Sequence, residues 1–158
     1  MTARVDIRKY LGSRAGQAML ALEAAVDESG LERRLIDLVK VRGSQINGCA
    51  YCIDMHTKDA RAAGETEQRL YALDAWRETP FFSARERAGL AWIEAVTLVS
   101  NAHVPDSVYE EAKAHFSEKE LVDLTYLAAT INAWNRLAIA LRSVPGRYRA
   151  ATTSSSAR

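Results

Sequence analysis

Hydrophobic residues recur through most of this chain at intervals of three and four positions, which is the spacing of one face of an α-helix. Ala88, Ala91, Trp92, Ala95 and Val99, for example, fall on a single helical face. No stretch of any length alternates between apolar and polar residues as a β-strand does, so the pattern predicts an all-α fold. The predicted helices span residues 14–28, 31–46, 49–63, 67–76, 84–100, 106–115 and 118–142.

The ends of these helices carry capping and stop signals. Ser83 and Ser117 are each followed three residues later by a glutamate, Glu86 and Glu120, and this spacing is typical of a capping box that opens a helix. Glycines close several helices, and Asn47-Gly48 separates the second predicted helix from the third. A new helix is therefore expected to start directly after Gly48.

The length of 158 residues suits one domain with its own core. We predict a single helical bundle of about six to seven helices over residues 13–146, preceded by a short lead-in, residues 1–12. Residues 147–158 end in a run rich in Ser and Thr without apolar periodicity, and they are expected to form a disordered tail.

Composition narrows the classes of function. The 21 Lys and Arg residues balance 20 Asp and Glu residues, and a formal net charge of +1 gives no basic surface for nucleic acid. The apolar run over residues 121–141 is interrupted by Asp123, Asn132, Asn135 and Arg136, which argues against a membrane span. The first ten residues are charged throughout, unlike a signal segment, so we expect a cytoplasmic protein.

The residues best suited to chemistry lie in one short stretch, which holds both cysteines and one of the three histidines. Helical spacing from residue 49 places Cys49, Cys52 and His56 on one face. Unpaired N–H groups at a helix start favour a thiolate, and a Cys-x-x-Cys pair there commonly has a lowered pKa. His56 is placed to accept the thiol proton, and the second cysteine can capture a sulfenic acid as a disulfide.

Two other interpretations of the cysteines remain open at this point. Free cysteines are among the most buried residue types, so the pair can be two ordinary core thiols. A zinc site is the second alternative, with Cys49, Cys52 and His56 as three ligands and Asp37 as a fourth. In a reducing compartment, however, a lone Cys-x-x-Cys pair is more often redox-active or metal-binding than a structural crosslink.

With these residues identified, the chain resembles the AhpD-like branch of the carboxymuconolactone decarboxylase superfamily over residues 32–141. The resemblance is carried by Cys49-x-x-Cys52-x-x-x-His56 and by the segment Ile131-Asn132-Ala133-Trp134-Asn135-Arg136-Leu137. It implies an all-helical fold, assembly as a homotrimer or homohexamer, and peroxidase activity without a prosthetic group.

The resemblance also implies roles for individual residues. Cys52 would be oxidised by a hydroperoxide to a sulfenic acid, and Cys49 would donate a proton and then resolve that acid as a disulfide. His56 would form a proton relay with a carboxylate of the preceding helix. That carboxylate is usually a glutamate twelve residues before the first cysteine, where this chain has the shorter Asp37. Tyr51 occupies the position between the cysteines where the best-known members have a histidine.

The leading hypothesis is therefore a thiol-dependent peroxidase, with a hydroperoxide as substrate and a dihydrolipoamide-bearing or thioredoxin-like protein as reductant. A non-catalytic redox sensor is one alternative. A decarboxylase or other lactone-handling enzyme of the same superfamily is another, although that chemistry does not need a Cys-x-x-Cys pair.

Overall fold

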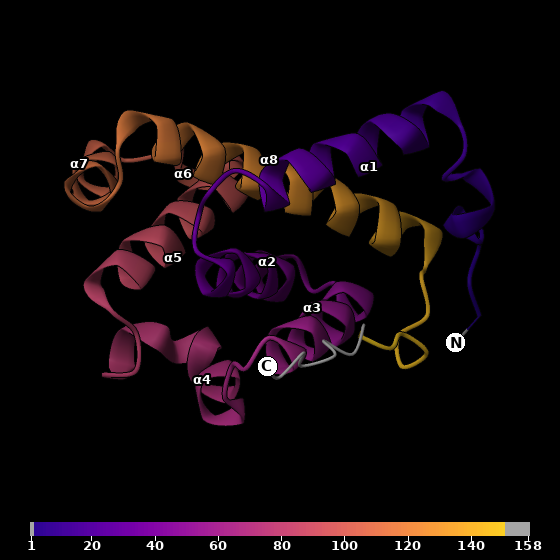
Figure 1. The fold of residues 1–158 in the computed structure, drawn as a ribbon, viewed down its shortest axis with the longest axis horizontal. Helices are drawn as coiled ribbons and strands as arrows, with labels where there is room; N and C mark the ends of the chain where they lie inside the picture. The colour runs from indigo at the N-terminus through magenta and orange to yellow at the C-terminus, as the bar shows by residue number, and fades with distance from the viewer. Residues whose placement is uncertain (1, 151–158) are drawn as a thin grey trace, which may run out of the picture.

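The computed structural model describes residues 2–150, which contain eight α-helices, two short 3₁₀-helices and no strands (Figure 1). The all-α prediction is confirmed. The 3₁₀-helices are η1 (Ile7–Tyr10) and η2 (Leu73–Glu78). The α-helices are α1 (Arg14–Asp27), α2 (Arg33–Asn47), α3 (Ala50–Ala62), α4 (Glu67–Ala72), α5 (Ala84–Thr97), α6 (Val99–Ala102), α7 (Asp106–His115) and α8 (Glu118–Leu141).

The predicted capping signals open the helices where expected. Ser83 and Ser117 each accept a hydrogen bond from the backbone N–H of the glutamate three residues on, and that glutamate bonds back to the serine N–H. The predicted number of helices was slightly too low, because the expected helix over residues 84–100 is divided at Leu98. The backbone of Leu98 leaves helical geometry, and the short α6 follows it.

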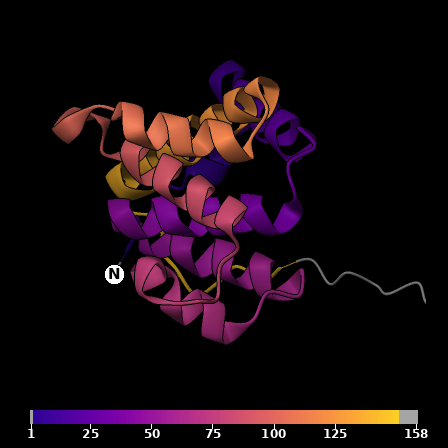
Figure 2. The same ribbon diagram turned by 90° about the vertical axis from the view of Figure 1, so that its left-hand side faces the viewer.

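Helix α2 lies at the centre of the bundle and packs against α3, α5 and α8. In Figures 1 and 2, α3 and α4 lie on one side of α2, and α8, with α1 alongside it, lies on the other. Most of the fully buried side chains are aliphatic and come from α2, α5 and α8; they include Ile36, Leu38, Val41, Leu90, Ile93, Leu124, Leu127 and Ile131. Burial of this apolar surface is the main force that holds the helices together.

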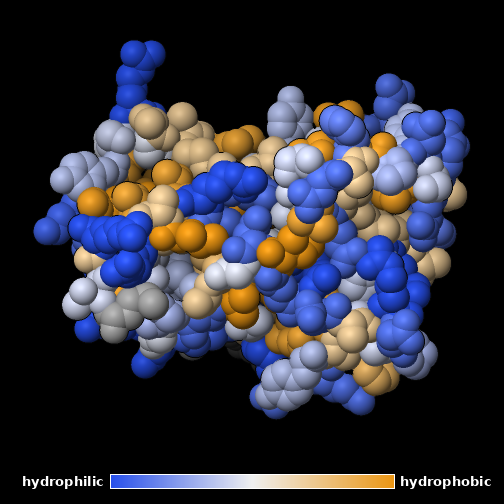
Figure 3. Space-filling view, turned by 180° about the vertical axis from the view of Figure 1, so that it is seen from behind, coloured by the Kyte–Doolittle hydropathy of each residue, from blue (hydrophilic) through white to orange (hydrophobic). Residues whose placement is uncertain are grey.

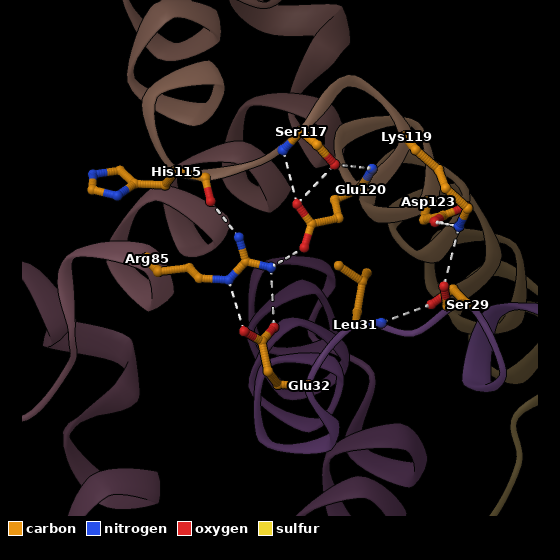
Figure 4. A network of polar contacts seen from close by, with 9 residues as sticks. All are labelled: Ser29, Leu31, Glu32, Arg85, His115, Ser117, Lys119, Glu120 and Asp123. Carbon is orange, nitrogen blue, oxygen red and sulfur yellow. Dashed lines mark hydrogen bonds and ion pairs between the residues drawn. The ribbon is translucent and has the colours of Figure 1, made fainter.

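The charged side chain of Arg85 joins four segments at one end of the bundle (Figure 4). Its guanidinium donates hydrogen bonds to both carboxylate oxygens of Glu32, to Glu120 and to the carbonyl oxygen of His115. The backbone N–H of Ser117 and the Arg85 guanidinium together lower the pKa of Glu120 to about 2. The start of α5 is thereby tied to the residue before α2, the end of α7 and the first turn of α8.

Both ends of the described chain pack against the helices. The backbone N–H groups of Arg4 and Val5 donate to the carbonyl oxygen of Leu141, at 3.0 and 3.3 Å. At the other end, the Tyr148 hydroxyl donates to Asp59 of α3 at 2.7 Å. Tyr148 falls in the segment expected to be a disordered tail, and the last part of that segment, 151–158, lies outside the described residues.

Over residues 2–150, no helix combines the length and the apolar character that crossing a lipid bilayer requires, and this includes α8 with its 24 residues.

Candidate functional site

The two cysteines lie where α2 ends and α3 begins. Gly48 adopts a left-handed conformation with φ of 68°, which glycine reaches at little cost, and this ends α2. Cys49 is the N-cap residue of α3, and its Sγ accepts a hydrogen bond from the backbone N–H of Cys52 at 3.3 Å. The cysteine pair therefore lies at the start of a helix, as predicted from the sequence.

Cys49 and Cys52 are joined as a disulfide, with their Cα atoms 5.3 Å apart. Their side chains pack with Ala138 of α8 and with Tyr51, and the two residues are only 1% and 2% exposed. Among the described residues, no three His, Cys, Asp or Glu side chains form a group suited to a metal ion. The described part of the chain therefore contains no cluster of zinc ligands made of the two cysteines, His56 and Asp37.

His56 lies one turn beyond Cys52 on α3 and is buried. Burial lowers the pKa of its imidazole to about 3, and the positive charges of Lys40 and Arg33 act in the same direction, while Asp27 opposes them. His56 is consequently neutral across the physiological pH range. A neutral imidazole one turn from Cys52 can accept a proton.

Asp37 is buried on α2, the helix that packs against α3, and its carboxylate is paired with Arg33. Both of its carboxylate oxygens accept hydrogen bonds from Nε of Arg33, at 2.9 and 3.0 Å. Within residues 2–150 no hydrogen bond joins Asp37 to His56. Burial raises the pKa of Asp37, although the neighbouring Arg33 opposes this effect.

Lys40 is a buried charge near His56 that sequence reasoning missed. Its Nζ donates to Glu23 at 2.5 Å and to Asp27 at 2.7 Å, both on α1. Burial disfavours the ammonium, but the two carboxylates outweigh it and raise the pKa of Lys40. The other oxygen of Glu23 accepts a hydrogen bond from Nε1 of Trp134 at 2.9 Å. The spacing of Glu23 and Asp27, four residues apart on one helix, is the one signal of this cluster in the sequence.

The segment over residues 131–137 of α8 holds the end of α2 in place directly before the cysteines. The side-chain amide of Asn47 donates to Oδ1 of Asn132 at 3.0 Å and to Oδ1 of Asn135 at 2.8 Å. Asn135 in turn donates to Oγ of Ser44, which donates to the carbonyl oxygen of Lys40. This chain of buried hydrogen bonds connects α8 to the cysteine-bearing turn, and the sequence alone contained no sign of these partners.

A cavity on another part of the molecule contains two arginines that are already paired. It measures about 500 Å³ and is lined by three arginines, among them Arg69 and Arg85. Arg69 is already bonded to Glu65, Glu86 and the carbonyl oxygen of Phe81, and Arg85 is occupied as in Figure 4. These guanidinium groups stabilise the bundle, and the candidate site remains at the disulfide.

Comparisons with known proteins identify the family of this chain. The model of the carboxymuconolactone decarboxylase family matches residues 14–95. The uncharacterized protein YdfG of Bacillus subtilis is 46% identical over 123 residues, which are 78% of this chain and 84% of that protein.

Two solved structures extend the comparison to the fold. ATU0492 of Agrobacterium tumefaciens, a protein of unknown function described as a putative antioxidant defence protein AhpD, superposes with a TM-score of 0.89. It is 42% identical, and the match covers 93% of this chain and all of that one. An uncharacterized peroxidase-related protein of Silicibacter sp. TM1040 has a TM-score of 0.74 and 26% identity, over 83% of this chain and 70% of that one. The chain therefore belongs to the carboxymuconolactone decarboxylase family, as an AhpD-like member.

Proposed function

We propose that this protein is a thiol-dependent peroxidase that reduces hydroperoxides through a dithiol and disulfide cycle of Cys49 and Cys52. The observation that carries the proposal is the arrangement at the start of α3. Two cysteines close enough to form a disulfide lie at a helix N-terminus, with a neutral histidine one turn further on. The likeness to proteins described as AhpD-like or peroxidase-related supports the same reaction.

The first step oxidises Cys52. His56 accepts the proton of the Cys52 thiol, and the thiolate attacks the terminal oxygen of the hydroperoxide. The O–O bond breaks, Cys52 becomes a sulfenic acid, and the leaving alkoxide takes the proton from His56 to form an alcohol. His56 is neutral and so has a free nitrogen for the thiol proton, but burial and the charge of Lys40 disfavour the imidazolium. In this proposal His56 therefore passes the proton on to the leaving oxygen and does not keep it.

The second step closes the disulfide. The Cys49 thiolate attacks the sulfur of the Cys52 sulfenic acid, and hydroxide leaves as water once it takes up a proton. In the structure Sγ of Cys49 accepts the N–H of Cys52, which is the kind of contact that stabilises a thiolate at a helix start. A dithiol protein, dihydrolipoamide-bearing or thioredoxin-like, then reduces the disulfide through a mixed disulfide and is itself oxidised.

In this proposal Asp37 is the carboxylate of the proton relay, provided that it can interact with His56. Arg33 occupies both of its oxygens, so Asp37 reaches His56 only through a bridging water or after Arg33 moves away. The proposed assembly is a homotrimer or homohexamer, and the mass of the purified protein by light scattering tests that part separately.

The test begins with the reduced protein and one equivalent of cumene hydroperoxide. We expect rapid loss of both thiols and a decrease of about two mass units, because disulfide formation removes two hydrogen atoms. Cys52→Ser should abolish peroxide turnover, whereas the matched Cys49→Ser variant should accumulate a sulfenic acid that dimedone traps. Equal peroxide reactivity of Cys52→Ser and the wild-type protein would disprove the assignment.

Burial of the disulfide favours one rival function, a redox sensor whose disulfide state is recognised by a partner. A sensor would be oxidised once by peroxide but would turn over slowly with every reductant, and its assembly would change on oxidation. Steady turnover with a dithiol protein would argue against the sensor. A lactone-handling enzyme would instead keep its activity after both cysteines are replaced.

A further inference from the structure

An apolar groove of about 620 Å³ opens between η1, the start of α1 and the last turns of α8. Its walls include the side chains of Ile7, Leu11, Met19 and Leu137 and the ring of Trp134. Figure 3, which shows the face opposite to Figure 1, has apolar side chains exposed at several places among polar ones. Grooves of this size and lining commonly hold a small molecule with a long apolar part.

One charged side chain lines this groove, that of Arg136 on α8. Its Nη1 donates to the carbonyl oxygen and to Oδ1 of Asn132, both at 2.9 Å, and this fixes the guanidinium. In residues 2–150 no carboxylate forms an ion pair with Arg136, and its Nε and Nη2 make no hydrogen bond. These two nitrogens form the edge that binds a carboxylate in a bidentate manner.

The groove runs along α8, the helix that also packs on the disulfide. Arg136 and Leu141 both line it, and five residues of α-helix separate them by about 7.5 Å along α8. Ala138, which lies between these two positions in the helix, packs against Cys49 and Cys52 on the neighbouring face of α8. A chain anchored at Arg136 and extended toward Leu141 would therefore run along the part of α8 that covers the cysteines.

We infer that this groove binds an unbranched fatty acid, with its carboxylate on Arg136 and its alkyl chain along α8 toward Leu141. Resting on the proposed peroxidase function, the inference names fatty-acid hydroperoxides as the substrate class. The apolar lining accounts for the alkyl chain, and the free edge of the one guanidinium in the wall accounts for the acid group.

Binding can be measured without any peroxide, on the disulfide form of the full chain. Trp134 lies in the groove wall, so its fluorescence is a suitable signal for titration with octanoate, decanoate and dodecanoate. Each methylene that enters the groove should tighten binding by up to about fourfold, until the groove is full and the affinity levels off. Dodecanol should bind less tightly than dodecanoate, because it lacks the charge.

Two pairs of variants locate the ligand. Arg136→Gln should weaken dodecanoate binding about fivefold and leave dodecanol binding unchanged, whereas Arg147→Gln, at an exposed arginine outside the groove, should change neither. Ala15→Trp places a large side chain in the groove and should abolish binding of both ligands. Ala18→Trp, on the same helix but outside the groove, should not.

Absence of saturable binding to the wild-type protein, or equal dodecanoate affinity of Arg136→Gln, would overturn the inference. The inference would also be wrong if a second copy of the chain covered the groove. In that case Ala15→Trp would have a lower mass than the wild-type protein by light scattering, and neither protein would bind fatty acid.

The two proposals fail separately. Turnover of hydrogen peroxide without fatty-acid binding rejects the groove alone, and fatty-acid binding without any peroxide turnover rejects the peroxidase alone. If both hold, the ratio of kcat/KM for a fatty-acid hydroperoxide to that for hydrogen peroxide should fall in Ala15→Trp and stay unchanged in Ala18→Trp.

Discussion

At the scale of single residues, the protonation state of His56 is set by its surroundings. The imidazole is removed from water, and the ammonium of Lys40 makes a second positive charge nearby unfavourable. Lys40 itself stays charged because Glu23 and Asp27 neutralise it. A buried cluster on α1 and α2 thus keeps the imidazole of the proposed site uncharged and makes it a weak base.

The lowered pKa of His56 predicts how stability depends on pH. The contribution of His56 is fully present above about pH 6.5, its unfolded pKa, and is lost as the pH falls toward its folded pKa of about 3, because only the unfolded chain is protonated there. Between about pH 6.5 and 4.5, the wild-type protein should lose about 1.4 kcal/mol of unfolding free energy per pH unit more than His56→Gln.

Urea denaturation of the two proteins across this pH window measures the difference. Asp37, whose pKa burial raises, acts with the opposite sign in both proteins and cancels from the comparison. Parallel stability curves for the two proteins would show that His56 is protonated in the folded state.

At the scale of secondary structure, the turn between α2 and α3 decides where the thiols lie. The left-handed Gly48 reverses the chain, after which the Cys49 backbone N–H donates to the carbonyl oxygen of Ser44 at 2.9 Å. Asn47 holds the same turn to α8 through Asn132 and Asn135. Local conformation and buried amide hydrogen bonds therefore act together on the start of α3.

Substitution of Gly48 tests the local part of this arrangement. No atom lies within 4 Å of a Cβ built at Gly48, so the cost of Gly48→Ala comes from its φ of 68° and not from a clash. We expect Gly48→Ala to lower the free energy of unfolding by about 1–2 kcal/mol. Gly48→Asn should cost less, because Asn tolerates this conformation better than Ala. Equal stability of Gly48→Ala and the wild type in urea denaturation would contradict the explanation.

At the scale of the whole molecule, the disulfide is closed off by segments far apart in the sequence. Ala138 near the end of α8 packs on it, and that helix end is held by the hydrogen bonds from Arg4 and Val5 to Leu141. A thiolate must approach a sulfur atom directly in order to exchange with a disulfide. Reduction of this disulfide therefore requires a local opening of the protein.

This requirement predicts the kinetics of reduction. The rate with dithiothreitol should rise at low concentration and then level off at the rate of opening, because each cysteine is no more than 2% exposed. In concentrated urea the protein is unfolded, so the rate of reduction should stay proportional to the dithiothreitol concentration. If the rate of reduction under native conditions stays proportional to the dithiothreitol concentration up to the highest concentration, dithiothreitol reaches the sulfur atoms without opening of the protein.

The sequence by itself determined the features that depend on neighbours within about one helical turn. The helix starts at Ser83 and Ser117, the break at Gly48 and the placement of Cys49, Cys52 and His56 along α3 all follow from such short spacings, and the structure contains each of them. The division at Leu98 was missed because the apolar periodicity continues through it.

Only the tertiary structure decided what meets across the helices. The resemblance implies a proton relay between Asp37 and His56, and in the structure the carboxylate of Asp37 is bonded to Arg33, one turn away on its own helix. The contacts of Lys40 with α1, of Tyr148 with α3 and of Arg4 with the end of α8 join residues whose spacing carries no periodic signal. Helix patterns specify which face is buried, whereas the partner of each buried polar group depends on how whole helices pack.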